Sequence, residues 1–388
     1  MSGSPLLPVF SDFDRAAMQR ALELAARGLT TTHPNPRVGC VLARGGRILA
    51  EGWHARAGEA HAEVVALESA GSRAAGATVY VTLEPCSHHG RTPPCVDALI
   101  GARVARVVYA IADPNPQVNG RGAALLAAAG IAVEEGLLAG EAGELNAGFL
   151  KRMRCGRPWV RLKLAMSLDG RTALAGGASR WVSGEAARAD VQQWRARSSA
   201  LLTGTGTVLA DDPRLDVRLG EEADGTPRRQ PLRVVLDSAL HTPPSARLFS
   251  VPGEVLIVTA VPATDPRWEP RCAALAARGA RIETLPADDG HVPLPALLER
   301  LGELEMNEVQ VEAGARLAGE LLRQSLVDEL LLYVAPKLLG PQARPLVVLP
   351  ELARLDAAPQ LMIHDVQRVG DDLRLLLRPR PPGAGPED

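Results

Sequence analysis

The sequence has few cysteines, few aromatic residues and no excess of basic charge, and each shortage excludes a class of protein. Five cysteines in 388 residues are too few for a disulfide-stapled scaffold and suit a reducing compartment, so we expect a cytoplasmic protein. Aromatic residues make up only 3%, so alanine, valine and leucine must build the cores. A net charge of −2 lacks the basic footprint of a nucleic-acid binder.

Long apolar runs are also absent. No stretch approaches the ~20 apolar residues that a membrane-spanning helix requires. The start, MSGSPLLPVF, lacks the basic segment and the long apolar run of a secretory signal, so we expect no membrane partner. What remains is an ordinary globular composition, 46% apolar and 23% charged. A chain of this length rarely forms a single core, so two domains are expected.

Helix and turn signals indicate an α/β organisation. The stretch SDFDRAAMQRALELAARG predicts a helix capped by Ser11 and Asp14. Gly45 and Gly46 between two apolar runs predict a hairpin. Strand and helix patterns then alternate up to a single closing helix at 141–153, which implies a layered α/β sheet.

The CGRP segment at 155–158 marks the expected domain boundary. We expect one domain over residues 1–155, a second over 156–380, and a disordered Pro- and Gly-rich tail over 381–388. The second domain again alternates strands and helices and ends in a hairpin around Gly370. Its apolar strand DELLLYVAP suits either a core or a subunit interface. Its helices are predicted at about 184–197, 270–279, 294–304 and 315–325.

His61, Cys86 and Cys95 form a candidate catalytic zinc site. Zinc favours nitrogen and sulfur ligands, and a catalytic site uses three protein ligands and leaves one position to water. Glu63 follows His61 by two residues, where a carboxylate can pass a proton from that water to a leaving amine. His-x-Glu followed by Pro-Cys and a second cysteine is the signature of zinc-dependent nucleobase deaminases.

Two other interpretations of this group stay open from the residues alone. A closed structural zinc site takes a fourth ligand, which His54, His88 or His89 could supply, and Glu63 would then be coincidental. Alternatively, the two cysteines are buried and bind no metal. Core or surface thiols are expected for the other cysteines, Cys40, Cys155 and Cys272.

The spacing of the two cysteines departs from the common deaminase motif. Eight residues, SHHGRTPP, separate them, where the common motif has two. With this spacing, PCSHHGRTPPC resembles the motif of the bifunctional riboflavin-biosynthesis proteins, as do TTHPNPRVGCVL and EGWHARAGEAHAE. The resemblance runs over residues 12–378. It implies a cytidine-deaminase-like three-layer α/β/α domain followed by a dihydrofolate-reductase-like α/β domain, with Zn²⁺ and NADPH as cofactors. We also expect a homo-oligomer, a dimer or a tetramer.

By this resemblance, the first domain hydrolyses the 2-amino group of 2,5-diamino-6-(5-phosphoribosylamino)pyrimidin-4(3H)-one, a small-molecule substrate. The three zinc ligands activate water, and Glu63 shuttles protons. Asn35 and His54 resemble the family's ring-binding positions, and His88 and Arg91, on the loop between the two cysteines, are placed to reach the substrate phosphate or ring. The alternative for each of these four is a solvated loop residue or a satisfied polar group of the core.

The second half has no Gly-x-Gly-x-x-Gly motif that opens a helix, which argues against an ordinary Rossmann site. Gly204 and Gly206 instead follow a strand pattern, and Gly314 lies where a strand meets a helix. Backbone N–H groups at such helix starts bind phosphate, although glycine also ends strands for structural reasons. Together with RLKLAMSLDGRTA, SRWVSG, LDS and VEAGARLAG, these turns resemble the reductase half of the same family.

That resemblance assigns two groups of residues. The NADPH site would be lined by Ala165, Trp181, Thr207, Asp211, Ser238, Gly314, Ala315, Arg316, Leu317, Ala318, Gly319 and Glu320. The substrate would lie against Lys163, Ser179, Arg195, Leu215, Arg218 and Glu312. The implied reaction is hydride transfer from NADPH to C1 of the ribosyl group or of its imine, which converts ribosylamino to ribitylamino.

Lys163 stands out without the resemblance. It is one of only three lysines among 43 basic residues, so its place in an apolar strand indicates that a compact ammonium is needed. The alternative is a strand residue that faces solvent. Arg218 could hold a ribose phosphate bidentately, and Asp211 could donate or orient a proton.

Two competing functions remain. One is a cytidine or tRNA adenosine deaminase with an appended nucleotide-binding domain, against which the long cysteine spacing and the balanced charge count. The other is a non-enzymatic nucleotide sensor with structural zinc, against which the intact Glu63 and the complete reductase motifs count.

Overall fold

The structure is a computed structural model that describes residues 10–87, 93–115, 119–222, 224–262, 265–266, 268–285 and 290–380. The tail at 381–388 and the loop residues His88, His89 and Arg91 therefore lie outside the described residues. The chain divides into two compact units between Gly156 and Arg157. Within the described residues, every helix is too short or too polar to cross a membrane.

The first unit is built on a five-stranded sheet in the order β2-β1-β3-β4-β5. β1 is antiparallel to β2 and β3, whereas β3, β4 and β5 run parallel. The strands are β1 (Gly39–Arg44), β2 (Arg47–Trp53), β3 (Thr78–Val81), β4 (Arg106–Tyr109) and β5 (Ala132–Glu135). The predicted hairpin is confirmed: Gly45 and Gly46 have φ of 57° and 72°, the left-handed conformation that a tight β-turn requires.

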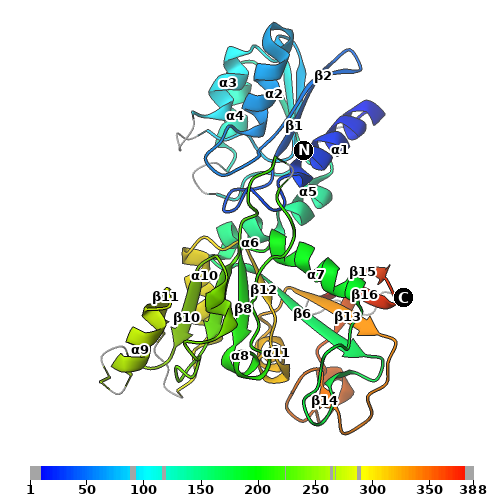
Figure 1. Ribbon diagram of the computed structural model, residues 1–388. Helices are drawn as coiled ribbons and strands as arrows, with labels where there is room; N and C mark the ends of the chain where they lie inside the picture. The colour runs from blue at the N-terminus through cyan, green and yellow to red at the C-terminus, as the bar shows by residue number, and fades with distance from the viewer. Residues whose placement is uncertain are drawn as a thin grey trace. The chain divides into compact units, whose positions relative to one another are not determined.

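Helices cover both faces of this sheet (Figure 1). α2, α3 and α4 pack Ala66, Leu99 and Leu126 on one face, and α1 and α5 pack Met18 and Ala142 on the other. The arrangement is therefore the expected three-layer α/β/α. The helices are α1 (Asp12–Ala26), α2 (Ala62–Ala70), the 3₁₀ turn η1 (Gly71–Ala74), α3 (Cys95–Gly101), α4 (Arg121–Ala128), α5 (Ala139–Leu145) and α6 (Ala147–Cys155).

Local side-chain chemistry sets two of the helix ends. α1 begins at the predicted capping box, in which the Asp14 N–H donates to the Ser11 hydroxyl and the Asp14 carboxylate accepts the Ser11 N–H. The single helix predicted over 141–153 is wrong. The chain leaves helical geometry at Asn146, with φ −113°, because the Asn146 side chain bonds the backbone of Arg37. α5 and α6 are therefore separate helices.

The second unit is built on a nine-stranded sheet in the order β11-β10-β9-β8-β12-β6-β13-β16-β15. The first seven strands are parallel, and β16 and β15 complete one edge as an antiparallel hairpin, which confirms the hairpin predicted around Gly370. The strands are β6 (Trp159–Ser167), β8 (Ala200–Gly204), β9 (Leu232–Leu236), β10 (Val255–Thr259), β11 (Ala280–Thr284), β12 (Glu308–Val311), β13 (Glu329–Ala335), β15 (Leu361–Val369) and β16 (Asp372–Pro379). β7 (Arg171–Ala173) and β14 (Arg344–Pro345) pair separately.

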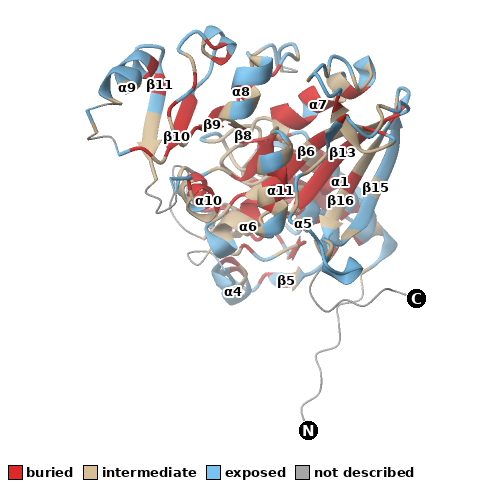
Figure 2. Cartoon of the chain, turned by 90° about the horizontal axis from the view of Figure 1, so that it is seen from below, coloured by how far each residue is buried: buried red, intermediate tan, exposed pale blue. Residues whose placement is uncertain are grey.

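Helices also cover both faces of the second sheet. α10 and α11 pack Leu297 and Leu321 on one face, and α7, α8 and α9 pack Val191, Val208 and Leu275 on the other. β13 is buried between β6 and β16 (Figure 2), so its apolar residues serve the core and not a subunit interface. The helices are α7 (Glu185–Arg197), α8 (Thr205–Asp211), the 3₁₀ turn η2 (Arg247–Ser250), α9 (Glu269–Ala276), α10 (Leu294–Glu303), α11 (Ala315–Arg323) and the 3₁₀ turn η3 (Leu355–Ala357).

Candidate active sites

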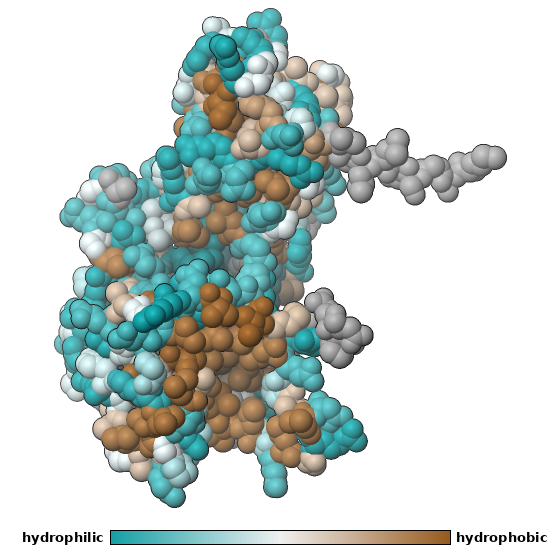
Figure 3. Space-filling view, turned by 90° about the vertical axis from the view of Figure 1, so that its right-hand side faces the viewer, coloured by the Kyte–Doolittle hydropathy of each residue, from teal (hydrophilic) through white to brown (hydrophobic). Residues whose placement is uncertain are grey.

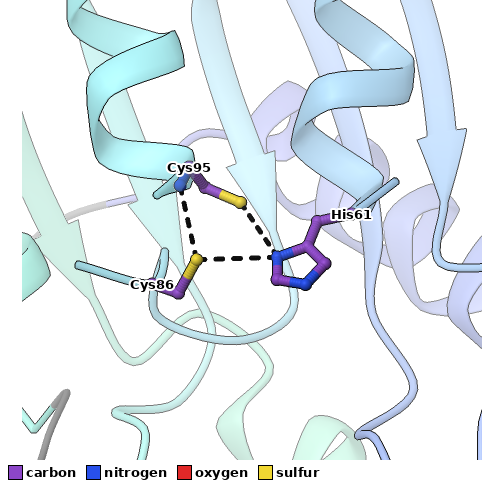
Figure 4. A group of neighbouring side chains, drawn as sticks. All are labelled: His61, Cys86 and Cys95. Atoms are coloured by element: carbon purple, nitrogen blue, oxygen red, sulfur yellow. Dashed lines mark hydrogen bonds between the residues drawn. The ribbon is translucent and has the colours of Figure 1, made fainter. Parts of the chain in front are cut away.

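Three side chains of the first unit meet where two helices begin. His61 is the N-cap residue of α2, Cys95 is the first residue of α3, and Cys86 lies in the segment after β3. Figure 4 shows their mutual approach: His61 Nδ1 lies 3.2 Å from Cys95 Sγ and 3.5 Å from Cys86 Sγ. One nitrogen and two sulfur atoms, all within 4.8 Å of one another, are a donor set that suits tetrahedral zinc.

The electrostatics of this group favour metal binding and proton transfer. Hydrogen bonds from Cys95 and His61 hold the pKa of the Cys86 thiol at about 4, so Cys86 is a thiolate, the form that binds metals. Glu63 lies in the first turn of α2 and is only 4% exposed. Burial, together with the negative charge of Cys86, raises the pKa of the Glu63 carboxyl. A carboxyl in this environment can take up and return a proton.

His54 lies beside the metal group without joining it. Its ring meets that of His61 edge-on, with the centroids 5.4 Å apart. Its Nε2 lies 3.0 Å from Asn35 Nδ2, and its Nδ1 lies 3.1 Å from the Ala60 carbonyl oxygen. Burial lowers the pKa of His54 and so favours the neutral ring. Among the described residues the metal group therefore stays at three ligands, and His54 supplies no fourth ligand for a structural zinc site.

In the second unit, Lys163, Arg195 and Glu312 come together from three elements. Lys163 lies on β6, Arg195 on α7, and Glu312 directly after β12, the neighbour of β6. The Arg195 guanidinium donates to both carboxylate oxygens of Glu312, at 2.7 and 2.8 Å. Burial lowers the pKa of Lys163, and Glu312 opposes this effect. Burial would raise the pKa of Glu312, but Arg195 and Lys163 hold it at about 2, so Glu312 is ionised beside the Arg195 guanidinium.

The segment that contains Leu215 and Arg218 lies against this cluster. Arg195 donates to the Asp216 carbonyl at 2.9 Å, and Leu215 is buried. The Arg218 side chain is 52% exposed and pairs with Asp216 at 2.9 Å, so it is accessible to a ligand. Ser179 lies between β7 and α7, and the structure describes no hydrogen bond that joins it to the cluster.

Comparison with known proteins places both sites in one family. The family model "RibD C-terminal domain" matches residues 158–375, and the model "Cytidine and deoxycytidylate deaminase zinc-binding region" matches residues 11–111. The riboflavin biosynthesis protein RibD of Escherichia coli K12 is 52% identical over 371 residues, which cover 94% of this chain and 99% of the relative. This chain belongs to the RibD family of riboflavin biosynthesis proteins.

Solved structures of RibD-family proteins resemble the whole chain. Acinetobacter baumannii RibD has a TM-score of 0.86 and 44% identity, and a Thermotoga maritima relative has a TM-score of 0.81 and 34% identity. Both alignments cover 95% of this chain and 99% of the other. The chain is a bifunctional enzyme of riboflavin biosynthesis with deaminase and reductase activities, which act on small molecules. The expected fold classes of the two units are confirmed.

Several cofactor positions expected from the RibD resemblance lie at the carboxyl ends of β8, β9 and β12, where open α/β sheets bind ligands. Thr207 lies on α8 after β8, Ser238 follows β9, and Gly314 is the N-cap residue of α11. A Cβ added at Gly206 or at Gly314 would meet no atom within 4 Å. Open space therefore lies beside both turns, as a bound phosphate group would require.

Three other residues predicted for the RibD cofactor site are packed against, or paired with, other parts of the second unit. Ala318 is buried in the main core, and a Cβ on Gly319 would lie 1.9 Å from the Val348 carbonyl oxygen. Glu320 pairs with Arg323 on the same helix. The remaining positions of the 314–320 segment, Gly314, Ala315, Arg316 and Leu317, lie at the helix start.

The last three predicted cofactor positions differ in exposure. Ala165 is half-buried on β6, and Asp211 is exposed at the end of α8. Trp181 is 62% exposed, and the Arg188 guanidinium stacks on its ring at 4.4 Å. Arg180 donates to the Asp211 carbonyl at 3.0 Å, which holds the Trp181 segment beside α8.

Sequence reasoning missed the polar residues that hold these RibD-family sites in shape. Asn146 accepts the Arg37 N–H at 2.8 Å and donates to the Arg37 carbonyl at 2.9 Å, which fixes the loop that carries Asn35. Gln310 donates to Glu312 at 2.9 Å, and Glu84 accepts several backbone N–H groups. In each case the sequence shows a polar residue within or next to an apolar run. Such a residue predicts a buried hydrogen bond but does not identify its partner.

Proposed function

We propose that the first unit hydrolyses the 2-amino group of 2,5-diamino-6-(5-phosphoribosylamino)pyrimidin-4(3H)-one, and that the second unit uses NADPH to reduce the ribosyl group of the product to a ribityl group. The observation that carries the proposal is the occurrence, in one RibD-family chain, of a three-ligand metal group beside a buried carboxyl and of a separate charged cluster. The Thermotoga maritima relative is described as a diaminohydroxyphosphoribosylaminopyrimidine deaminase/5-amino-6-(5-phosphoribosylamino)uracil reductase. The corresponding domains are residues 1–155 and 156–380.

The donor set of the first unit fits zinc, and His61, Cys86 and Cys95 are the residues that would hold it. A bound zinc ion supplies a Lewis acid that lowers the pKa of water. Glu63, buried against the ligands, would take a proton from the attacking water and deliver it to the 2-amino nitrogen. The water oxygen bonds to C2, the C2–N bond breaks and ammonia leaves, and C2 becomes a carbonyl carbon as the second water proton passes to the adjacent ring nitrogen.

Substrate positioning in the first unit falls to the residues around this group. The hydrogen bond between Asn35 and His54 holds both side chains in place to bind the pyrimidine ring. His88 and Arg91 stay predictions for the phosphate or the ring. In the neutral state that burial favours for His54, Nδ1 donates to the Ala60 carbonyl and Nε2 accepts from the Asn35 amide.

The dinucleotide would bind beside Gly206 and Gly314, where an added Cβ meets no atom within 4 Å and where the backbone N–H groups at the start of α11 can receive phosphate. NADPH supplies a hydride when bound. Lys163 binds an oxygen of the open-chain ribosyl group. Glu312, kept ionised by Arg195, accepts a hydrogen bond from a ribosyl hydroxyl. Arg218, accessible at the surface, pairs with the 5-phosphate.

A stepwise assay tests both halves. Zinc content is measured first, ammonia release from the diamino substrate second, and NADPH oxidation with the deaminated product third. We expect one zinc per chain and both activities. Turnover of only cytidine or of tRNA would instead favour the alternative, a deaminase with an appended nucleotide-binding domain.

We also propose that the protein forms a homo-oligomer through the β15–β16 hairpin. Exposed apolar side chains gather on this edge of the second unit, Ile363 at 64% and Val366 at 50% among them (Figure 3). The charges of the hairpin are mixed, with Arg368 next to Asp371, so a second copy of the same surface is complementary to it. Light scattering should show a dimer or tetramer that Val366→Glu dissociates, and a monomeric wild type at micromolar concentration would contradict this. The cytoplasmic location stays a prediction.

A further inference from the structure

Glu84 lies between β3 and the zinc ligand Cys86, and the residue is only 3% exposed. It makes no ion pair among the described residues; its four partners are backbone N–H groups of one segment. Oε2 accepts from Asp113 at 3.3 Å and from Gly120 at 3.0 Å, and Oε1 accepts from Gly122 at 3.1 Å and from Ala123 at 3.3 Å. A buried carboxylate needs such partners, and here a single loop and helix start supply all four.

This arrangement is an N-cap supplied from another part of the chain. α4 begins after Gly120, which has a left-handed backbone and no side chain with which to cap the helix. The N–H groups of Gly122 and Ala123 belong to the first turn of α4 and have no partner within the helix. Glu84 binds them, with its negative charge at the positive end of the helix dipole.

The same contact fixes the backbone that leads to Cys86. A Cβ on Gly122 would lie 2.2 Å from the Pro85 carbonyl oxygen, so α4 packs directly against the residue before the ligand. On its other side, the Cys86 carbonyl accepts the Val96 N–H at 3.2 Å, and the Cys86 sulfur accepts the Cys95 N–H at 3.3 Å. Cys86 is thus held between α4 and α3, and Glu84 is the link to α4.

We propose that Glu84 is a positioning residue for zinc: by binding the start of α4 it places the Cys86 sulfur at the right distance from His61 and Cys95. This inference rests on the proposed zinc site and adds a residue that contacts neither metal nor substrate. Its consequence is a specific one. Loss of the Glu84 carboxylate should weaken zinc binding, and not merely lower the melting temperature.

The test is zinc affinity of the full-length chain, measured by titrating metal-free protein against a chromophoric chelator well below its melting temperature. Glu84→Gln keeps the size of the side chain but replaces one acceptor oxygen with an N–H donor that faces backbone N–H groups. We expect zinc affinity to fall about 10- to 100-fold, the usual effect of losing a residue that supports a metal ligand. Glu68→Gln, on the exposed side of α2, is the matched control and should bind zinc as the wild type does.

A second variant reaches Cys86 by another route. Gly122→Ala leaves Glu84 in place but drives a methyl group into the Pro85 carbonyl, so it should also weaken zinc binding. Gly143→Ala on α5, where an added Cβ meets nothing within 4 Å, is its control. If Glu84→Gln prevents folding of the first unit, Gly122→Ala decides the question.

The outcomes separate the inference from the function on which it rests. A wild type that binds no zinc overturns the proposed function and this inference with it. A wild type that binds zinc, with Glu84→Gln and Gly122→Ala of equal affinity, overturns the inference alone, even if both variants melt at lower temperature. Weakened binding in these two variants, with both controls unchanged, supports it.

Discussion

The two sites of this chain are assembled in different ways. The zinc ligands and Glu63 all lie within residues 61–95, where loops meet the starts of two helices. The charged cluster of the second unit draws on residues 163–312, and its members meet only because the parallel sheet places β6 beside β12 and α7 packs on the same sheet. A site within one short segment leaves a motif in the sequence, whereas a site assembled by a sheet leaves only isolated residues.

The electrostatics differ as well. The first site brings a thiolate and a buried carboxyl close together, so a bound cation would balance its negative charge. The second site already balances most of its own charge, because Arg195 holds Glu312 bidentately. Removing one group should therefore abolish one reaction at the first site without unfolding it, whereas at the second site it should cost both activity and stability.

The largest effect is expected for Glu63→Gln. The variant keeps the size of the side chain and all three zinc ligands but cannot shuttle protons, so deamination should fall about 10²–10⁴-fold. Zinc content and NADPH-dependent reduction of the deaminated product should match the wild type. Normal ammonia release by this variant would show that another residue transfers the proton.

Lys163→Ala tests the second site in the same way. Loss of the ammonium should slow NADPH oxidation about 10²-fold, the usual cost of misplacing a reacting group, while ammonia release stays unchanged. Lys163→Arg should restore little, because a planar guanidinium does not replace a compact ammonium. Loss of both activities in Lys163→Ala would contradict two independently working units.

The difference between the sites also explains which parts the sequence could predict. Residue types and their spacing were enough to predict the three zinc ligands, and the structure brings their ligand atoms within 4.8 Å of one another. Local signals also sufficed for the capping box at Ser11 and the hairpin turn at Gly45 and Gly46. Each of these features is decided by residues a few positions apart.

The remaining features depend on partners far along the chain. Arg195 and Glu312 are 117 positions apart, and only a family resemblance connected them. The break between α5 and α6 escaped prediction because its cause, the bond from Asn146 to Arg37, spans 109 positions. α8 escaped for the opposite reason, because its glycines indicate a turn locally while packing of Val208 against the sheet completes a helix.

Asn146→Ala should produce a smaller effect, confined to substrate binding in the first unit. It removes two part-buried hydrogen bonds to Arg37, worth about 1 kcal/mol each, and so frees the loop that carries Asn35. We expect KM for deamination to rise about tenfold with zinc content and kcat nearly unchanged. Asn119→Ala, at an exposed position, is the control. A fall in kcat without a change in KM would place the role of Asn146 elsewhere.

The smallest expected effect concerns pH and the charged cluster. The pKa of Glu312 is about 2 in the folded protein against an ordinary value of 4.5. Its ionised form therefore stabilises the fold fully above pH 4.5, by at most about 3 kcal/mol, and this contribution declines as pH falls from 4.5 toward 2. The difference in free energy of unfolding between wild type and Glu312→Gln should be largest near neutral pH and shrink below pH 4.5. A difference that is constant down to pH 3 would show that the Glu312 carboxylate and Arg195 do not stabilise the second unit through their charges. The two sites would then not differ in the way that their charges are balanced.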